Sequence, residues 1–162
     1  MPRRIPKAIP SVSIADIWAY TSRNVTEHEF EEFYGADEVQ TTLNTIGSDQ
    51  SLGSRNIVVA IPVNMEIVRV LALALIEVAN RTTNAQNIDL NLKVDGTPIF
   101  SQDDVAVFDD AIGTCPVVIS QDATAIVTGD GTYSLEAEAQ ISAAQNVTFT
   151  VQYYLFVLYR RS

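Results

Sequence analysis

The sequence predicts a mainly β protein: an antiparallel β-sandwich, jelly-roll-like, with an extended N-terminal arm and one or two short helices. Two observations support this. From Asn56 to Tyr159 apolar and polar residues mostly alternate, which is typical of strands with one buried and one solvated face. Turn residues also separate these runs at short spacing. Roughly seven or eight strands therefore fit into this region, as in a sandwich or jelly roll.

The individual strands follow from this alternation. Residues 132–141 and 88–94 each place apolar side chains on one face and polar ones on the other. Asp95-Gly96 is a two-residue hairpin turn that leads into a strand at 97–100. Further strands are expected in these segments: 56–61, 117–120, 123–128 and 146–159.

Residues 65–80 form the most apolar segment and are apolar on both faces. Their length and their Leu and Ala content also suit a buried helix. The strand-rich surroundings favour a long central strand, because buried central strands read as continuous apolar runs.

The N-terminal part differs in composition. Residues 1–12 hold three prolines, which block helix and central strand, so an extended arm that rests on another chain is expected. Two capping patterns, Ser13 with Asp16 and Thr26 with Glu29, predict short helices, the second carrying an apolar stripe that ends before Gly35. Residues 36–55 are polar and suggest a linker. The predicted division is 1–55 for arm, helices and linker, and 56–162 for the sandwich.

Charge is unevenly distributed along the chain. The net charge is −10, which argues against nucleic acid as a direct partner. Positions 8 to 159 hold five basic and twenty acidic residues, whereas the arm carries Arg3, Arg4 and Lys7 before any acid. A basic arm that docks on the acidic surface of a neighbouring copy or of a scaffold is one interpretation, and solubility combined with chance is the other. Trp18, the only tryptophan, is the expected anchor of this arm.

No catalytic set is evident, so the protein is not expected to be an enzyme and no cofactor is expected. His28 is the only histidine and lies among glutamates, where a solvated helix surface explains it better than a metal site. Cys115 is alone and fits a small buried residue. Acid pairs at 103–104 and 109–110 bracket an apolar VAVF, and a calcium loop is the alternative to solvated loop acids. No membrane segment is expected.

The last strand carries the aromatic residues that require an explanation. One face of 147–159 is apolar throughout, whereas the other begins polar and becomes apolar at Tyr154 and Phe156. These two residues are expected to be interface aromatics, covered by the N-terminal helices or by another subunit. The alternative is a sugar-binding platform built from exposed rings.

One N-terminal segment resembles structural proteins of tailed viruses of bacteria and archaea, in which a D-x-W-x-Y-x-x-R-x-x-T pattern recurs. In this chain the pattern falls on Asp16, Trp18, Tyr20, Arg23 and Thr26, within residues 14–26. The sandwich, with its segment 92–97 (LKVDGT), is similar in style to β-sandwich domains on viral capsids and tails.

The resemblance implies a virion component, such as a capsid decoration, turret or tail-surface protein, that forms a homo-oligomer and binds other virion proteins. The alternative is a β-sandwich module that binds a glycan or a host surface.

Overall fold

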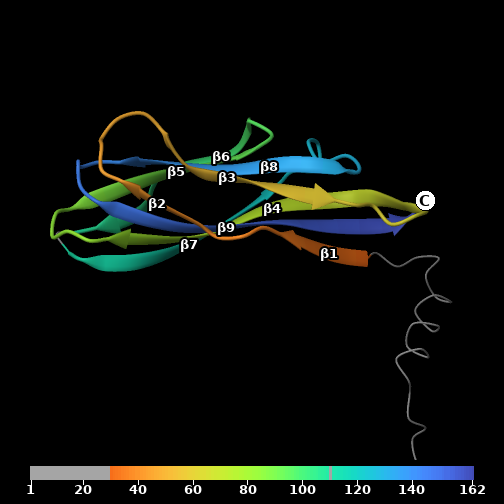
Figure 1. Cartoon of the computed structure of the whole chain (residues 1–162), viewed down its shortest axis with the longest axis horizontal. Helices are drawn as coiled ribbons and strands as arrows, with labels where there is room; N and C mark the ends of the chain where they lie inside the picture. Colours follow the sequence, from red (N-terminus) through yellow and green to blue (C-terminus); the bar gives the residue numbers. More distant parts are fainter. Residues whose placement is uncertain (1–29, 110) are drawn as a thin grey trace, which may run out of the picture.

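The computed structural model describes residues 30–109 and 111–162. These residues form strands, turns and loops (Figure 1). Nine strands follow one another in the described part of the chain: β1 (Phe30–Gly35), β2 (Val39–Leu43), β3 (Gln50–Val59), β4 (Met65–Asn80), β5 (Gln86–Val94), β6 (Thr97–Phe108), β7 (Gly113–Asp122), β8 (Gly131–Ile141) and β9 (Val147–Arg161). They form two layers that face one another, which confirms the predicted antiparallel sandwich (Figure 1).

The strand order is that of a jelly roll. Four antiparallel pairs, β2 with β9, β3 with β8, β4 with β7 and β5 with β6, amount to one long hairpin. The hairpin is wrapped so that β4 also pairs with β9 and β5 with β8. The result is one sheet ordered β2-β9-β4-β7 and a second ordered β3-β8-β5-β6. The strand β1 extends the first sheet by pairing with the C-terminal half of β9.

Inward-facing residues of both sheets form one core. On β5, β8 and β9 every second residue is buried, as the period-two pattern predicts, and the residues between them are partly exposed. The ambiguous segment 65–80 is the strand β4, pairing on both sides, so the strand prediction was correct. The Asp95-Gly96 turn is confirmed as well: both residues have positive φ, 47° and 74°, as a tight hairpin turn requires.

The predicted second helix is wrong where the structure describes it, because Phe30–Gly35 is the strand β1. The spacing of Phe30, Phe33 and Tyr34 suggested one helical stripe, yet Phe33 contacts Phe156 on the outside, whereas the Tyr34 hydroxyl bonds that of Tyr159. Pairing with β9 supplies the backbone hydrogen bonds and the cross-strand aromatic contacts that decide the conformation. The first expected helix lies outside the described residues.

Two further expectations are corrected. Residues 36–55 are no linker, because they contain β2 and most of β3, so strands of the sandwich precede residue 56. Residues 123–128 are a turn and not a strand. The Asp122 carboxylate accepts the Thr124 N–H at 2.9 Å and so ends β7, while Ala123 and Val127 are buried one helical turn apart.

Candidate assembly surface

The two aromatics singled out from the sequence, Tyr154 and Phe156, lie on the outer face of the first sheet. Neither is fully buried, since β9 keeps alternate residues partly exposed. The ring of Phe156 lies 4.8 Å from that of Phe33 on β1, centroid to centroid, and the two planes are tilted by 53°. Phe33 remains 65% exposed. Rings tilted in this way do not make the flat platform on which a sugar would stack.

The strand β4 continues this apolar surface. Its core-facing residues include the small side chains of Ala72 and Ala74, both fully buried, while Leu71, Leu73 and Leu75 point to the outside. The register places Leu71 beside Phe156, Leu73 beside Tyr154, and Leu75 beside Val118 of β7. Large apolar residues thus occupy the solvent side of a strand whose core side takes alanine.

We call this surface the apolar face. It crosses β1, β9, β4 and β7, and its members are Phe33, Leu71, Leu73, Leu75, Val118, Tyr154, Phe156 and Leu158. Val118 is 67% exposed and Leu75 38%. Contiguous exposed apolar surfaces on soluble proteins mark sites of contact with another molecule.

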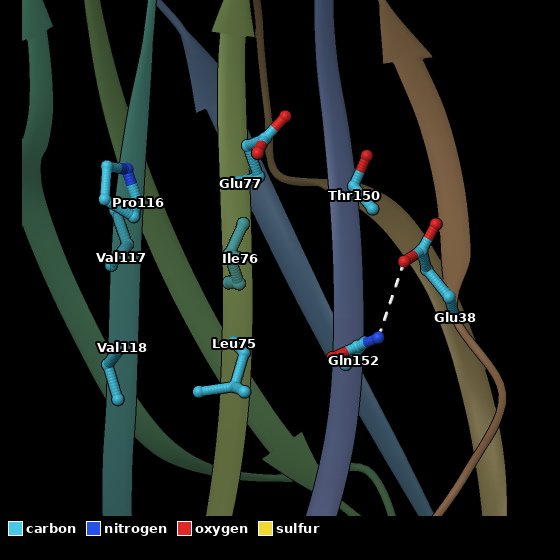
Figure 2. Close-up of a pocket in the computed structure, with 9 residues that line it drawn as sticks. All are labelled: Glu38, Leu75, Ile76, Glu77, Pro116, Val117, Val118, Thr150 and Gln152. Atoms are coloured by element: carbon cyan, nitrogen blue, oxygen red, sulfur yellow. Dashed lines mark hydrogen bonds between the residues drawn. The ribbon is translucent and has the colours of Figure 1, made fainter.

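At the β2 end of the sheet the apolar face runs into an open hollow of about 360 Å³. Figure 2 shows its lining on three neighbouring strands, with Leu75 and Glu77 on β4, Pro116 and Val118 on β7, and Thr150 and Gln152 on β9. Glu38 stands at the β9 side, where its carboxylate accepts a hydrogen bond from the Gln152 amide at 3.4 Å. The hollow therefore combines an apolar floor with a carboxylate at two of its sides.

A buried tyrosine, Tyr153, forms hydrogen bonds between this sheet and the other layer. The Tyr153 hydroxyl accepts the Ala137 N–H of β8 at 2.8 Å and donates to the Gly53 carbonyl of β3 at 2.6 Å. It thereby fills the β-bulge of β3 between Ser51 and Ser54, where the ladder to β8 is interrupted. Burial raises the pKa of Tyr153 to about 12. The sheet that carries the apolar face is thus hydrogen-bonded to two strands of the other layer.

A pair of tyrosines, Tyr34 and Tyr159, links β1 to β9. The hydroxyls of Tyr34 and Tyr159 are 2.7 Å apart, and Tyr34 also donates to the Ala60 carbonyl, at 3.0 Å. Burial is the largest of the causes that raise the pKa of Tyr34 well above its ordinary value. Burial also raises the pKa of Tyr159. These contacts keep Phe33, on the opposite side of β1, in position beside Phe156.

The remaining sequence candidates are distributed as follows. Arg3, Arg4, Lys7, Trp18 and His28 lie outside the described residues. Among the described residues no three His, Cys, Asp or Glu side chains gather where they could hold a metal ion. Nor does this part of the chain contain a helix long and apolar enough to cross a membrane. Cys115 is a partly buried free thiol that packs against the core.

The expected acidic loop is not a loop. Asp103 and Asp104 belong to β6, at a bulge where the Asp104 N–H donates to the Asp89 carboxylate at 2.9 Å. Asp109 follows the end of that strand, and Asp110 lies outside the described residues. Six residues of extended chain span roughly 20 Å, so Asp103 and Asp109 do not converge.

Sequence reasoning missed several members of the surface. The sequence predicts a helix at Phe33, which could cover the last strand but not pair with it, and a linker at Glu38. A usable signal existed in the segment 71–75, where leucine alternates with alanine. When large and small apolar residues alternate along a strand, the small side chains can face a tightly packed core. The large apolar side chains then lie on the opposite face.

Comparison with known protein families and with curated proteins found no match. Among solved structures the chain is similar to the VP2 subviral particle of infectious bursal disease virus, at 15% identity and a TM-score of 0.42, covering 84% of this chain and 38% of VP2. T=1 particles derived from that virus give 14% identity, a TM-score of 0.43, and coverage of 84% and 36%.

Dimeric latent PorU from Porphyromonas gingivalis is similar as well, at 12% identity and a TM-score of 0.39, covering 80% of this chain and 13% of PorU. The chain thus spans less than two-fifths of each of these proteins. Structures with such low identity and TM-scores carry no argument about what the chain does. Its function is therefore inferred from its own surfaces.

Proposed function

We propose that this protein is a structural component of a virus particle that assembles with copies of itself through the apolar face. The observation that carries the proposal is the run of large apolar side chains on the outer side of the first sheet, from Phe33 to Val118. A partner that covers this face removes apolar area from water, which is the main driving force of association.

A second copy is the occupant that the charges favour. Residues 1–12 carry three basic and no acidic residues, whereas residues 30–162 carry six basic and seventeen acidic ones. A chain with a basic arm and an acidic body is complementary to itself, because the arm of one copy is attracted to the body of the next. No other partner is needed for such an assembly.

A virion is the setting that the chain's own features favour. Jelly rolls recur in viral capsid proteins, and they recur in lectins and cupins too, so the fold alone does not choose. The segment 14–26, which resembles structural proteins of tailed viruses, favours the virion. Within a particle the role would be that of a capsid decoration, turret or tail-surface protein, with no catalytic activity, no cofactor and no direct contact with nucleic acid.

Mass measurement on the native protein tests the proposal. We expect a closed oligomer whose dissociation constant rises at least tenfold in Phe33→Ser, with the melting temperature nearly unchanged because Phe33 is mostly exposed. Val58→Ser is the matched control, since Val58 is 64% exposed on the second sheet and should not alter the mass. A chain that stays monomeric at all concentrations and binds glycans would favour the module that recognises a glycan.

A further inference from the structure

The hollow beside the apolar face has two carboxylates that no cation of the described chain neutralises. Glu77 has no hydrogen-bond or ion-pair partner among the described residues, and Glu38 has only the Gln152 amide. A second hollow, near Ile67, also contains a carboxylate, but there Glu66 is already paired with Arg160. The first hollow is therefore the one that offers negative charge to a ligand.

The floor of the hollow on β4 and β7 is apolar, whereas Thr150 and Gln152 of β9 lie between Glu77 and Glu38 (Figure 2). Leu75 and Val118 lie directly opposite one another on β4 and β7, both more than a third exposed, and Pro116 continues the floor beside Glu77. A fitting ligand is an extended peptide that carries an apolar side chain and neighbouring basic ones, because such a peptide can cover the apolar floor and bring positive charge to both carboxylates.

The chain contains such a peptide at its own start. Residues 3–7 read Arg-Arg-Ile-Pro-Lys, an apolar residue flanked by positive charge, and Pro2 and Pro6 restrict the backbone to extended conformations. A segment that is already extended loses little conformational entropy on binding. The sequence of the arm and the chemistry of the hollow are complementary at each of these positions.

We propose that residues 3–7 of one copy bind in the hollow of a neighbouring copy, with Ile5 on Leu75 and Val118 and the basic side chains facing Glu38 and Glu77. This inference rests on the proposed function, since it names the partner that occupies one end of the apolar face. It also gives the basic arm a defined receptor.

The start of the described chain lies away from its own hollow. Phe30, where the described chain begins, pairs with Tyr159, whereas the hollow lies beside residues 150–152 of the same strand β9. The two places are therefore roughly 25 Å apart along the sheet. Because β1 runs from Tyr159 toward the hollow, Phe30 is the end of β1 that lies farther from the hollow.

Disulfide trapping in the full-length chain tests the site. In a Cys115→Ser background, Ile5→Cys combined with Val118→Cys should give covalent dimers and larger species under oxidising conditions. Ile5→Cys with Val58→Cys is the matched control, because Val58 is as exposed as Val118 but lies on the other sheet. A monomer without free thiols would show that the arm binds its own chain and would overturn the proposal, as would equal dimer yields from both pairs.

A charge exchange provides an independent measurement. Glu77→Lys should raise the dissociation constant of the oligomer at least tenfold, Arg4→Glu should restore part of it in the double variant, and Asp103→Lys should have no effect. A monomeric wild-type chain would refute the proposed function itself. An oligomer that is indifferent to Glu77→Lys, and that cross-links at Val118 no better than at Val58, would refute the arm site alone.

Discussion

Replacing Tyr153 by phenylalanine tests how the two sheets are held together. The substitution keeps the ring and removes the hydroxyl that accepts the Ala137 N–H and donates to the Gly53 carbonyl. Ala137 is fully buried, so water cannot readily reach its N–H once the hydroxyl is gone. The bulge of β3 leaves no strand partner at this point of the ladder.

The magnitude follows from these two groups. A buried backbone donor or acceptor that loses its partner costs about 1–3 kcal/mol. Gly53 is less buried than Ala137, so its carbonyl contributes the smaller part. We expect a loss of roughly 2–4 kcal/mol of the free energy of unfolding, a large part of the stability of a typical domain. For a chain of this size the melting temperature should fall by roughly 4–16 °C.

Urea unfolding followed by circular dichroism measures this loss, with Tyr133→Phe as the matched control. The Tyr133 hydroxyl also bonds backbone, donating to the Gly129 carbonyl at 2.8 Å, but it lies at a turn that water can reach. The control should therefore lose about 1 kcal/mol or less. Equal losses in the two variants would refute the reasoning, because they would show that the Ala137 N–H finds another partner.

Three further outcomes are expected. Gly53→Ala should cost about 2 kcal/mol or more in urea unfolding, because Gly53 has a φ of +95° and an added Cβ would lie 2.6 Å from Val39 Cγ1; an unchanged midpoint would contradict this. The raised pKa of Tyr153 means that the folded state keeps a proton that the unfolded state loses, so Tyr153 alone should lower the stability by about 2–3 kcal/mol as pH rises from 10 to about 12. Tyr153→Phe should show a smaller decline across that window, and an identical decline would count against the assignment. Calcium or a chelator should leave the melting temperature unchanged, whereas a drop of several degrees with chelator would revive the acidic site that includes Asp103.

Part of the candidate site was predictable. The alternation in 147–159 correctly put Tyr154 and Phe156 on the face opposite the core, and the need to cover them pointed to an interface. The hollow was not predictable, because Leu75, Val118 and Gln152 are distant in sequence and become neighbours only through the pairing of β4 with β7 and β9. The basic arm was visible from composition, but its receptor required the structure.

The sequence by itself determined where strands with one buried face lie, because the alternation of side chains across a strand is a local property. It therefore specified β5, β8, β9 and the turn at Asp95-Gly96. Only the tertiary structure decided that Phe30–Gly35 is a strand and that 123–128 is a turn. Both segments are decided by partners that the fold brings to them and that outweigh local propensity. For Phe30–Gly35 the partner is β9, and for 123–128 it is the Asp122 side chain together with the core. Whether a second layer covers an apolar face likewise depends on the order of the strands in the fold. In this jelly roll the face of β4 that carries Leu71, Leu73 and Leu75 lies on the outside of the sandwich.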